Sequence, residues 1–286
     1  MQSIDLCKLG FTHVECVRPI YTGLMSVNYY IKCEQGEFLV KQILNNTHAR
    51  QQKLLANLNS SRTFPMGPHF LRKIEVEDGC FFIFNWVHGK HILLDKLSPQ
   101  NFKEFLSRYM EFISAIKENA YTQPAYALEE NLRTIPPKYP FVQQDMDAIL
   151  QDLSNPVHLQ VIHGDFHFKN ILFQDGHLKA LLDFEDLRFG CPTEDLMYLL
   201  ISNTERHLFY HTKRTLKLLE VMMEQTPFSK QDWLRGLDVY IVKRYSRKLA
   251  KKHLTLYKRL ALWRNSMLYR HIRRFICGNL SPIREK

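Results

Sequence analysis

The sequence of 286 residues lacks most features that mark secreted, metal-binding or membrane proteins. Its six cysteines include no C-x-x-C pair and no Cys/His group with zinc spacing, so we expect reduced thiols in a cytoplasmic protein. The first residues contain no basic segment followed by an apolar run, and no apolar stretch approaches the length of a membrane span. Its eleven glycines form neither a Walker A pattern nor G-x-G-x-x-G. These absences exclude a zinc finger and a P-loop protein.

The net charge of +10 is distributed unevenly along the chain. Residues 241–286 hold 14 of the 39 basic side chains and one of the 29 acidic ones, so this segment carries +13 and the first 240 residues carry −3. Apolar residues recur at helical spacing through 239–276, which predicts amphipathic helices. In the simpler interpretation their cations only face water. In the alternative, 241–276 contacts an anionic partner, either an acidic substrate or an anionic surface, with nucleic acid the less favoured choice.

The periodicity of apolar residues differs between the first ninety residues and the rest of the chain. Its first ninety residues read mostly as strands, and period-2 alternation in the second of them places Leu39, Lys41 and Ile43 on one face. From Ser98 onward the period becomes helical, interrupted by short strands. The expected elements are strands at 27–33 and 38–44, a helix at 47–58, a hairpin at 74–86, a helix at 98–116, strands at 157–163 and within 170–184, and helices after 193. This order predicts an α+β, two-lobed protein divided into 1–88 and 89–286.

The most informative stretch is HGDFHFKNILFQDGHLKALLDFED, residues 163–186. It begins with a loop that contains Asp165 and leads into a strand at Asn170. The turn at Asp175-Gly176 then returns the chain, so that Asp183 is expected opposite Asn170. One carboxylate and one amide oxygen, with nucleotide phosphates, suit Mg²⁺, and Asp165 is near enough to accept a proton from an attacking hydroxyl. Each residue alone could be an ordinary turn or strand-end residue, but the combination favours catalysis.

The same residues carry a resemblance to a known family. HGDFHFKNIL followed by LLDFED resembles the signature of the aminoglycoside phosphotransferase and choline kinase group, and GCPTEDLMYL is similar to the segment that follows it there. The resemblance is specific over 161–200 and weaker over 20–90. It implies a protein-kinase-like fold in which Asp165 is the catalytic base, His163 braces the catalytic loop, and Asn170 and Asp183 bind Mg²⁺. Asp195 would anchor the loop.

The resemblance also implies nucleotide-binding roles for residues of the N-terminal strands. Lys41, in FLVK, would hold the α- and β-phosphates of ATP. Ser26 and Asn28 belong to the segment where a phosphate-covering loop is expected. Asn85 and Val87 would belong to the hinge that offers backbone groups to adenine. From alternation alone, Lys41 is equally well an edge-strand lysine on a solvated face.

Two positions depart from the family pattern. Kinase-like folds usually pair the strand lysine with a glutamate on the next helix, but the helix HARQQKLLANL has Gln51 and Gln52 there. Cys191 also stands after Gly190 where the family commonly has an aspartate. Glu185, two residues after Asp183, is a possible substrate-facing or outer metal-site acid.

Together these features predict an ATP- and Mg²⁺-dependent phosphotransferase that modifies a hydroxyl of a small-molecule or glycan-like acceptor. By resemblance the C-terminal helices help build the acceptor site, and their +13 charge disfavours a polycationic aminoglycoside and favours an anionic acceptor. One alternative is a protein Ser/Thr kinase, although no glycine follows Phe184 and no A-P-E segment is present. The other is a non-catalytic nucleotide-binding adaptor.

Overall fold

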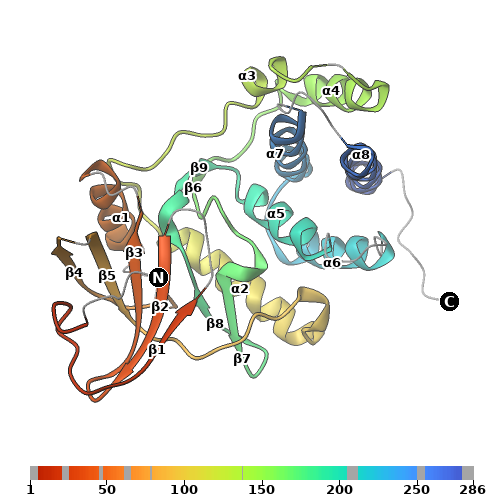
Figure 1. Ribbon diagram of the computed structural model, residues 1–286. Helices are drawn as coiled ribbons and strands as arrows, with labels where there is room; N and C mark the ends of the chain where they lie inside the picture. Colours follow the sequence, from red (N-terminus) through yellow and green to blue (C-terminus); the bar gives the residue numbers. More distant parts are fainter. Residues whose placement is uncertain are drawn as a thin grey trace.

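A computed structural model describes residues 6–20, 26–44, 48–60, 66–77, 79–136, 138–204, 212–249 and 255–278. The chain folds into a strand-rich N-terminal lobe and a mostly helical C-terminal lobe, as its periodicities predict. Figure 1 shows the five-stranded sheet on one side and helices α3 to α8 on the other, with the β7–β8 hairpin between them. The predicted lobe boundary between residues 88 and 89 stays a prediction.

The N-terminal lobe is an antiparallel sheet with strand order β1-β2-β3-β5-β4 and one helix, α1. Alternate side chains of β5 enter two different apolar clusters: Phe81 and Ile83 pack on one face, and Cys80, Phe82 and Phe84 on the other. Both faces of this strand are therefore covered, which explains its continuous apolar sequence. The elements are β1 (Val14–Ile20), β2 (Ser26–Cys33), β3 (Gly36–Ile43), α1 (His48–Ser60), β4 (Phe70–Val76) and β5 (Gly79–Asn85).

The C-terminal lobe is organised around α2 (Pro99–Ala115). Ser98 caps this helix by accepting a hydrogen bond from the Asn101 N–H at 3.1 Å, and Pro99 occupies the first turn. The predicted apolar stripe, from Phe102 to Ile113, is buried in the main core. The remaining helices are α3 (Leu128–Arg133), α4 (Pro140–Asp152), α5 (Pro192–Thr204), α6 (Thr212–Gln225), α7 (Lys230–Leu249) and α8 (Leu256–Ile276).

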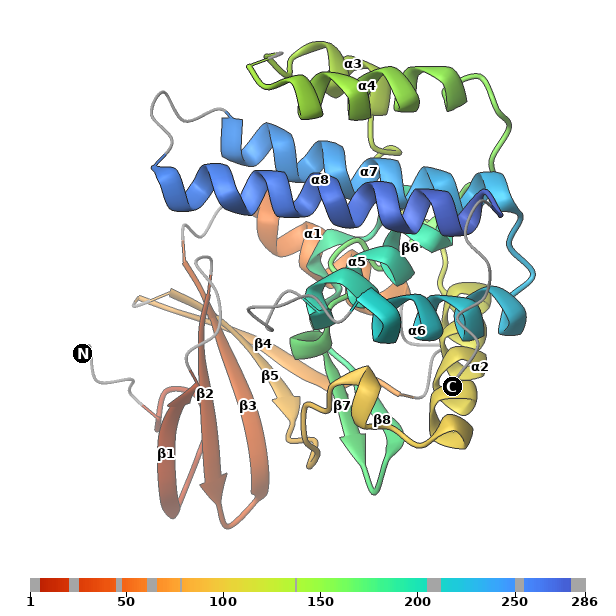
Figure 2. The same cartoon turned by 90° about the vertical axis from the view of Figure 1, so that its right-hand side faces the viewer.

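Two short antiparallel strand pairs lie between α4 and α5 and hold the motif at 163–186 in place. Strand β6 (Gln160–Ile162) pairs with β9 (Arg188–Gly190), and β7 (Ile171–Gln174) pairs with β8 (His177–Leu181). The expected strand at 157–163 is thus limited to three residues, because its partner β9 is equally short. Figure 2 shows α8 crossing the outer side of the molecule in front of α7.

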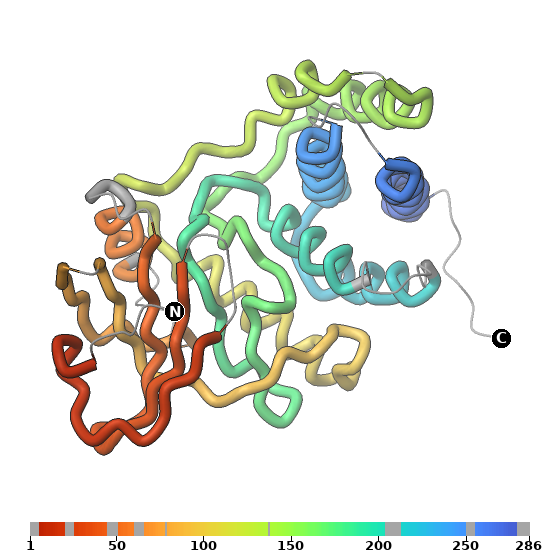
Figure 3. The backbone as a smooth tube through the Cα atoms, viewed as in Figure 1, coloured from red at the N-terminus to blue at the C-terminus, as the bar shows by residue number. Residues whose placement is uncertain are grey.

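Two features were not named from the sequence: the edge strand β1, and the helices α3 and α4. The chain reaches α3 through an extended segment that passes close to α1, as Figure 3 shows. Gln123 in this segment also forms a parallel bridge with Arg188 of β9. In the described ranges, no helix is both long enough and apolar enough to cross a lipid bilayer.

Candidate active site

The loop after β6 has a backbone shape that requires glycine. Gly164 has a φ of +82°, and a Cβ there would lie 2.0 Å from the carbonyl oxygen of Asp186. The preceding His163 is fully buried, and its Nε2 donates a hydrogen bond to the Leu182 carbonyl oxygen at 2.9 Å. His163 therefore links the start of the loop to the residue immediately before Asp183.

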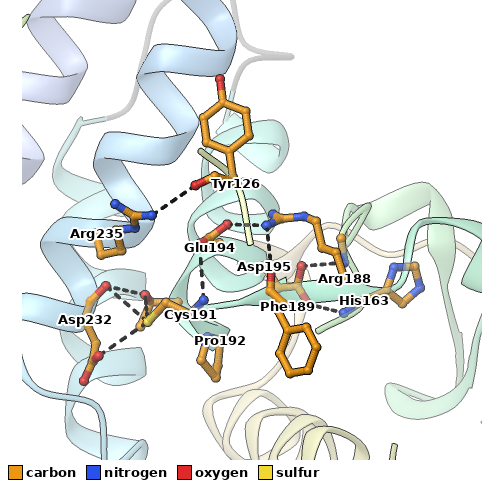
Figure 4. Close-up of polar contacts among 12 residues, drawn as sticks. Tyr126, His163, Arg188, Phe189, Cys191, Pro192, Glu194, Asp195, Asp232 and Arg235 are labelled. Carbon is orange, nitrogen blue, oxygen red and sulfur yellow. Dashed lines mark hydrogen bonds and ion pairs between the residues drawn. The ribbon is translucent and has the colours of Figure 1, made fainter. Parts of the chain in front are cut away.

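Asp195, in the first turn of α5, fixes the same loop from behind. One of its carboxylate oxygens accepts from the N–H of His163 at 2.8 Å, and the other accepts from the N–H of Gly164 at 3.0 Å. Figure 4 shows this carboxylate among the buried polar groups around the loop. A short acidic side chain at a helix start can hold two backbone donors at once, so Asp195 has the geometry of an anchor.

A buried ion pair supports the segment that leads into α5. Arg188 lies 2.6 Å from Glu194, and their side chains are 9% and 1% exposed. Glu194 also accepts a hydrogen bond from the N–H of Cys191 at 3.1 Å (Figure 4). The Cys191 thiol contacts the Thr193 hydroxyl and the Asp232 carboxylate at 3.1 and 3.5 Å, and burial raises its pKa to about 12. Cys191 is therefore a neutral packing residue, consistent with a structural position.

Asp165 and Asn170 form one hydrogen-bonded unit. The Asn170 amide group donates to the Asp165 carbonyl oxygen at 2.9 Å and to its carboxylate at 3.2 Å. Because both partners are acceptors, the amide nitrogen must point toward Asp165, and the amide oxygen is left for another ligand. His167 completes the unit: its Nδ1 accepts from the Lys169 N–H, so its Nε2 carries the proton that faces Asp165 at 3.4 Å. Sequence reasoning had given His167 no role.

These contacts control the charge of Asp165. Burial alone would raise its pKa, but the hydrogen bond and the charge of His167 outweigh burial, helped by His163 and Asn170, so the net pKa is lowered. The carboxyl group is therefore ionised at neutral pH.

Lys41 joins the two lobes at the second half of the motif. Its side chain is 10% exposed, and its Nζ lies 3.0 Å from the Asp183 carboxylate and in close contact with that of Glu185. Burial alone would lower the pKa of Lys41, but the two carboxylates raise it overall. Asp183 has a φ of +63°, a left-handed conformation that aspartate tolerates better than most residues. Among the described residues, the two acidic partners of Lys41 therefore both come from the motif. Gln51, which stands on α1 where a glutamate was expected, is buried.

Helix α1 reaches the motif through Asn57, which sequence reasoning missed. The Asn57 side chain is fully buried, and its amide donates to the carbonyl oxygens of Phe184 and Glu185 at 2.9 and 3.2 Å. Its own oxygen accepts from the Asn119 amide at 3.0 Å. No local pattern could identify this residue, because its partners lie more than sixty positions away along the chain.

A cavity of about 260 Å³ lies between the lobes. Six of the nine predicted site residues line it: Asn28, Lys41, Asn85, Val87, Asn170 and Asp183. Ser26 does not; it is buried and lies in register opposite Ile43. His163 and Asp165 are also outside its lining, although Asp165 contacts the lining residue Asn170. The rest of the predicted phosphate-covering segment, 23–25, lies outside the described residues.

At the hinge side of the cavity, the backbone role expected of Asn85 and Val87 stays a prediction, and both residues line the cavity. The Asn85 side-chain oxygen accepts from the His69 N–H, so this amide is directed toward the start of β4. Apolar side chains form much of the cavity lining, among them Leu39, Leu54, Phe84 and Leu172. The cavity therefore combines an apolar end with a polar end formed by Lys41, Asn170 and Asp183.

The residues at the polar end fit a magnesium ion. Asn170 offers an amide oxygen and Asp183 a carboxylate, both hard oxygen ligands of the type that Mg²⁺ takes together with phosphates and water. The orientation that Asp165 imposes on the Asn170 amide leaves its oxygen available. Among the described residues, no cluster of three or more His, Cys, Asp or Glu side chains forms an all-protein metal cage. The donor set thus suits an ion shared with a phosphorylated ligand.

The model of the phosphotransferase enzyme family matches residues 17–216, which include the sheet, the motif and α5. The chain belongs to this family. It is therefore a phosphotransferase that acts on an alcohol group. No curated protein sequence matches the chain significantly.

Solved structures show the same fold at low sequence identity. An aminoglycoside phosphotransferase APH(4)-Ia, in a ternary complex with ADP and hygromycin B, has a TM-score of 0.64 at 12% identity, over 96% of this chain and 99% of that one. Macrolide 2'-phosphotransferase MphH from Brachybacterium faecium scores 0.63 at 14% identity, over 99% and 98%. Choline kinase LicA from Streptococcus pneumoniae scores 0.58 at 15% identity, over 90% and 94%. The predicted protein-kinase-like fold is confirmed.

Proposed function

We propose that this phosphotransferase uses ATP and Mg²⁺ to phosphorylate a hydroxyl of a small-molecule or glycan-like acceptor. One observation carries the proposal: Lys41, Asn170 and Asp183 line a single cavity, and Asn170 is hydrogen bonded to Asp165. That arrangement combines a cation for phosphates, oxygen ligands for a metal and an ionised carboxylate for a hydroxyl. The presence of ADP and ATP in complexes of the structural neighbours supports ATP as the donor.

The nucleotide would lie with its base at the apolar end of the cavity and its phosphates at the polar end. Lys41 would then move its ion pairing from Asp183 and Glu185 to the phosphates, because a buried lysine needs an anion in either state. Asp183 would be released to bind Mg²⁺ with Asn170. Asn28 faces Lys41 across the β2–β3 ladder and would contact the phosphate end, and Val87 would offer backbone groups to the base.

Asp165 would act as the catalytic base. Its carboxylate is held by Asn170 and faced by the His167 N–H, so its position is set before an acceptor arrives. The lowered pKa keeps it ionised, and it would accept the proton of the acceptor hydroxyl as that oxygen attacks the γ-phosphorus. His163 would keep the loop in place through Leu182. When bound, Mg²⁺ would neutralise charge on the transferred phosphoryl group.

The acceptor class is inferred from charge. The C-terminal segment 241–286 carries +13, which would repel a polycation such as an aminoglycoside and attract an acidic molecule. We therefore expect neutral or anionic hydroxyl compounds to be better acceptors than polyamines.

ADP formation from ATP and Mg²⁺, measured over a panel of neutral, anionic and cationic hydroxyl compounds, tests the function. Asp183→Asn should reduce the dependence of ATP affinity on Mg²⁺ by roughly 10–100-fold or more. Loss of a residue that only supports a metal ligand already costs that much, and Asp183 would bind the metal directly. Asp175→Asn, at the exposed turn between β7 and β8, is the matched control and should behave as wild type. If ATP binds with the same Mg²⁺ dependence in wild type and Asp183→Asn, the metal assignment is wrong.

A further inference from the structure

Helix α8 has two different apolar faces. One packs against α4, α6 and α7 and contains the buried residues Leu262, Leu268, Tyr269, Ile272 and Ile276. This face explains how the helix is held on the C-terminal lobe. It leaves the opposite face of the helix turned toward solvent.

The outward face of the first three turns is also apolar. Leu256 is 73% exposed, Leu260 51%, Trp263 48% and Met267 45%, and Tyr257 beside them is 74% exposed. Positions 256, 260, 263 and 267 are spaced by four, three and four residues, which places their side chains in one row along the helix. We call these five residues the α8 stripe. At 1.5 Å per residue the row is about 16 Å long, and so many large exposed apolar side chains in a row mark an interaction surface.

The surroundings of the α8 stripe are cationic. Helix α8 contains six lysines and arginines and no acidic residue. Arg270 and Arg273 are held on the inner side by Asp145 and Asp152. In the part of the chain that the structure describes, no ion pair is formed by Arg259 or Arg274, and both lie on the stripe side of the helix, which leaves these two cations for a partner.

We propose that the α8 stripe docks this protein on an anionic lipid bilayer. Leucine, methionine, tyrosine and tryptophan side chains would enter the interface between headgroups and acyl chains, and the arginines on the same side of the helix would pair with anionic headgroups. The helix axis would lie parallel to the bilayer surface. None of the five stripe residues lines the cavity between the lobes, so the docking surface and the cavity lining share no residue.

Two other partners fit less well. A symmetric dimer through this face would bring the arginines at 259 and 274 of two copies into one interface, and like charges across an interface are unfavourable. A protein partner would need a complementary groove, since α8 lies on the outer side of the molecule (Figure 2). A bilayer interface conforms to a protruding row of side chains and supplies the negative charge.

Sedimentation of the full-length protein with vesicles tests the proposal. Vesicles of phosphatidylcholine with phosphatidylserine should bind the protein, and vesicles of phosphatidylcholine alone should bind it much less. Trp263 is a built-in reporter, because Trp233 is fully buried in the core and Trp86 lies in the hinge. Its fluorescence should shift to shorter wavelength on binding to the anionic vesicles, and Trp263→Phe should remove that shift while keeping the affinity.

Matched variants locate the surface. Leu260→Ser with Trp263→Ser should weaken vesicle binding by about tenfold or more, and Arg259→Gln with Arg274→Gln by roughly fivefold for each cation. The controls are Leu150→Ser, an equally exposed leucine on α4, and Lys103→Gln with Lys117→Gln, two exposed lysines elsewhere. All variants should retain wild-type thermal unfolding and nucleotide binding, which shows that they fold.

Three outcomes would overturn the proposal: no binding to anionic vesicles, equal binding to both vesicle types, or equal losses in the stripe and control variants. Light scattering during size-exclusion chromatography gives a further check. A dimer that the stripe substitutions dissociate would assign the stripe to a second copy of the chain instead. The vesicle measurement requires no phosphoryl acceptor, so its result does not depend on whether the proposed reaction is correct.

Discussion

Single residues in the motif have distinct physical tasks, although they lie within about twenty positions of each other. Gly164 provides a backbone conformation and His163 a link to Leu182. Asp165 and Asp183 are both carboxylates, yet their surroundings differ: one faces an amide and an imidazole, and the other faces a lysine. These different neighbours support the proposed roles, in which Asp165 accepts a proton and Asp183 binds the metal.

Replacing Asp165 tests the first of these tasks. Asp165→Ala should lower turnover by about 10²–10⁴-fold, because the base and its orientation of the acceptor hydroxyl are lost. ATP affinity should be nearly unchanged, because Asp165 does not line the cavity. Steady-state kinetics and calorimetry with ATP measure the two effects. Near-normal turnover in a folded Asp165→Ala protein would rule out its role as the base.

The burial and protonation of individual thiols can be tested without knowing the phosphoryl acceptor. Burial raises the pKa of Cys80 to about 11 and that of Cys191 to about 12, whereas Cys7 and Cys16 are exposed. At pH 8, alkylation of the native protein followed by peptide mass spectrometry should modify Cys7 and Cys16 and spare Cys80 and Cys191 until denaturant is added. Rapid native labelling of Cys191 would contradict its buried, protonated state.

The same two thiols give the protein a pH dependence of defined sign. Their pKa values are higher in the folded state than in the unfolded chain, so the folded state binds more protons above about pH 8.5. The free energy of unfolding should therefore fall as pH rises from about 9 through 11. Cys80→Ala with Cys191→Ala should flatten this fall relative to wild type in urea titrations at each pH. An unchanged slope would show that other groups cause it.

At the scale of elements, α1 and the segment between α2 and α3 hold the motif from outside. Asn57 on α1 bonds the backbone of Phe184 and Glu185, and Asn119 bonds Asn57. Helix α1 thereby supports the Asp183 segment through a neutral side chain rather than through a glutamate paired with Lys41. Where a glutamate would pair α1 with Lys41 of β3, α1 is instead connected through Asn57 to the segment after Asp183.

A double-mutant cycle tests this connection. Asn57→Ala should lower the free energy of unfolding by about 1–3 kcal/mol, since buried carbonyl oxygens lose their donors. Asn57→Ala and Asn119→Ala should be coupled by about 0.5 kcal/mol or more, and Asn57→Ala should also weaken ATP affinity in the presence of Mg²⁺. Asn131→Ala, on α3, is the control, because its amide bonds only the Ala127 carbonyl oxygen within its own helix region. Strict additivity would show that no such relay exists.

Sequence reasoning succeeded where the relevant information is local. Asp165, Asn170 and Asp183 fall within one hairpin, so their spacing already indicated that they meet. The α2 helix was predictable because its cap and apolar stripe are contiguous. Ser26 does not line the cavity, and its place in a phosphate-covering loop stays a prediction, because residues 23–25 lie outside the described residues. Asn57 was missed since its task depends on carbonyl oxygens 127 and 128 positions later.

For the whole molecule, Lys41 connects the two lobes, and in the proposed function it also binds the phosphates of the nucleotide. It belongs to β3, and its partner Asp183 lies 142 residues later in the other lobe. A ligand that binds only the folded state at 100 times its dissociation constant stabilises it by about 2.7 kcal/mol. With an unfolding entropy of about 2 cal/mol/K per residue, this corresponds to a rise in Tm of roughly 4–5 °C for a chain of this length.

The last prediction separates this connection from ordinary sheet stability. ATP with Mg²⁺ should raise the Tm of wild type by that amount in differential scanning calorimetry, and Lys41→Met should abolish most of the rise, because the phosphates lose their buried cation. Lys73→Met is the matched control: Lys73 is a half-buried sheet lysine, but its partner Glu75 belongs to the same strand. Its Tm should still rise with ATP. If Lys41→Met and Lys73→Met respond equally to ATP, Lys41 only stabilises the lobe contact and does not hold the nucleotide.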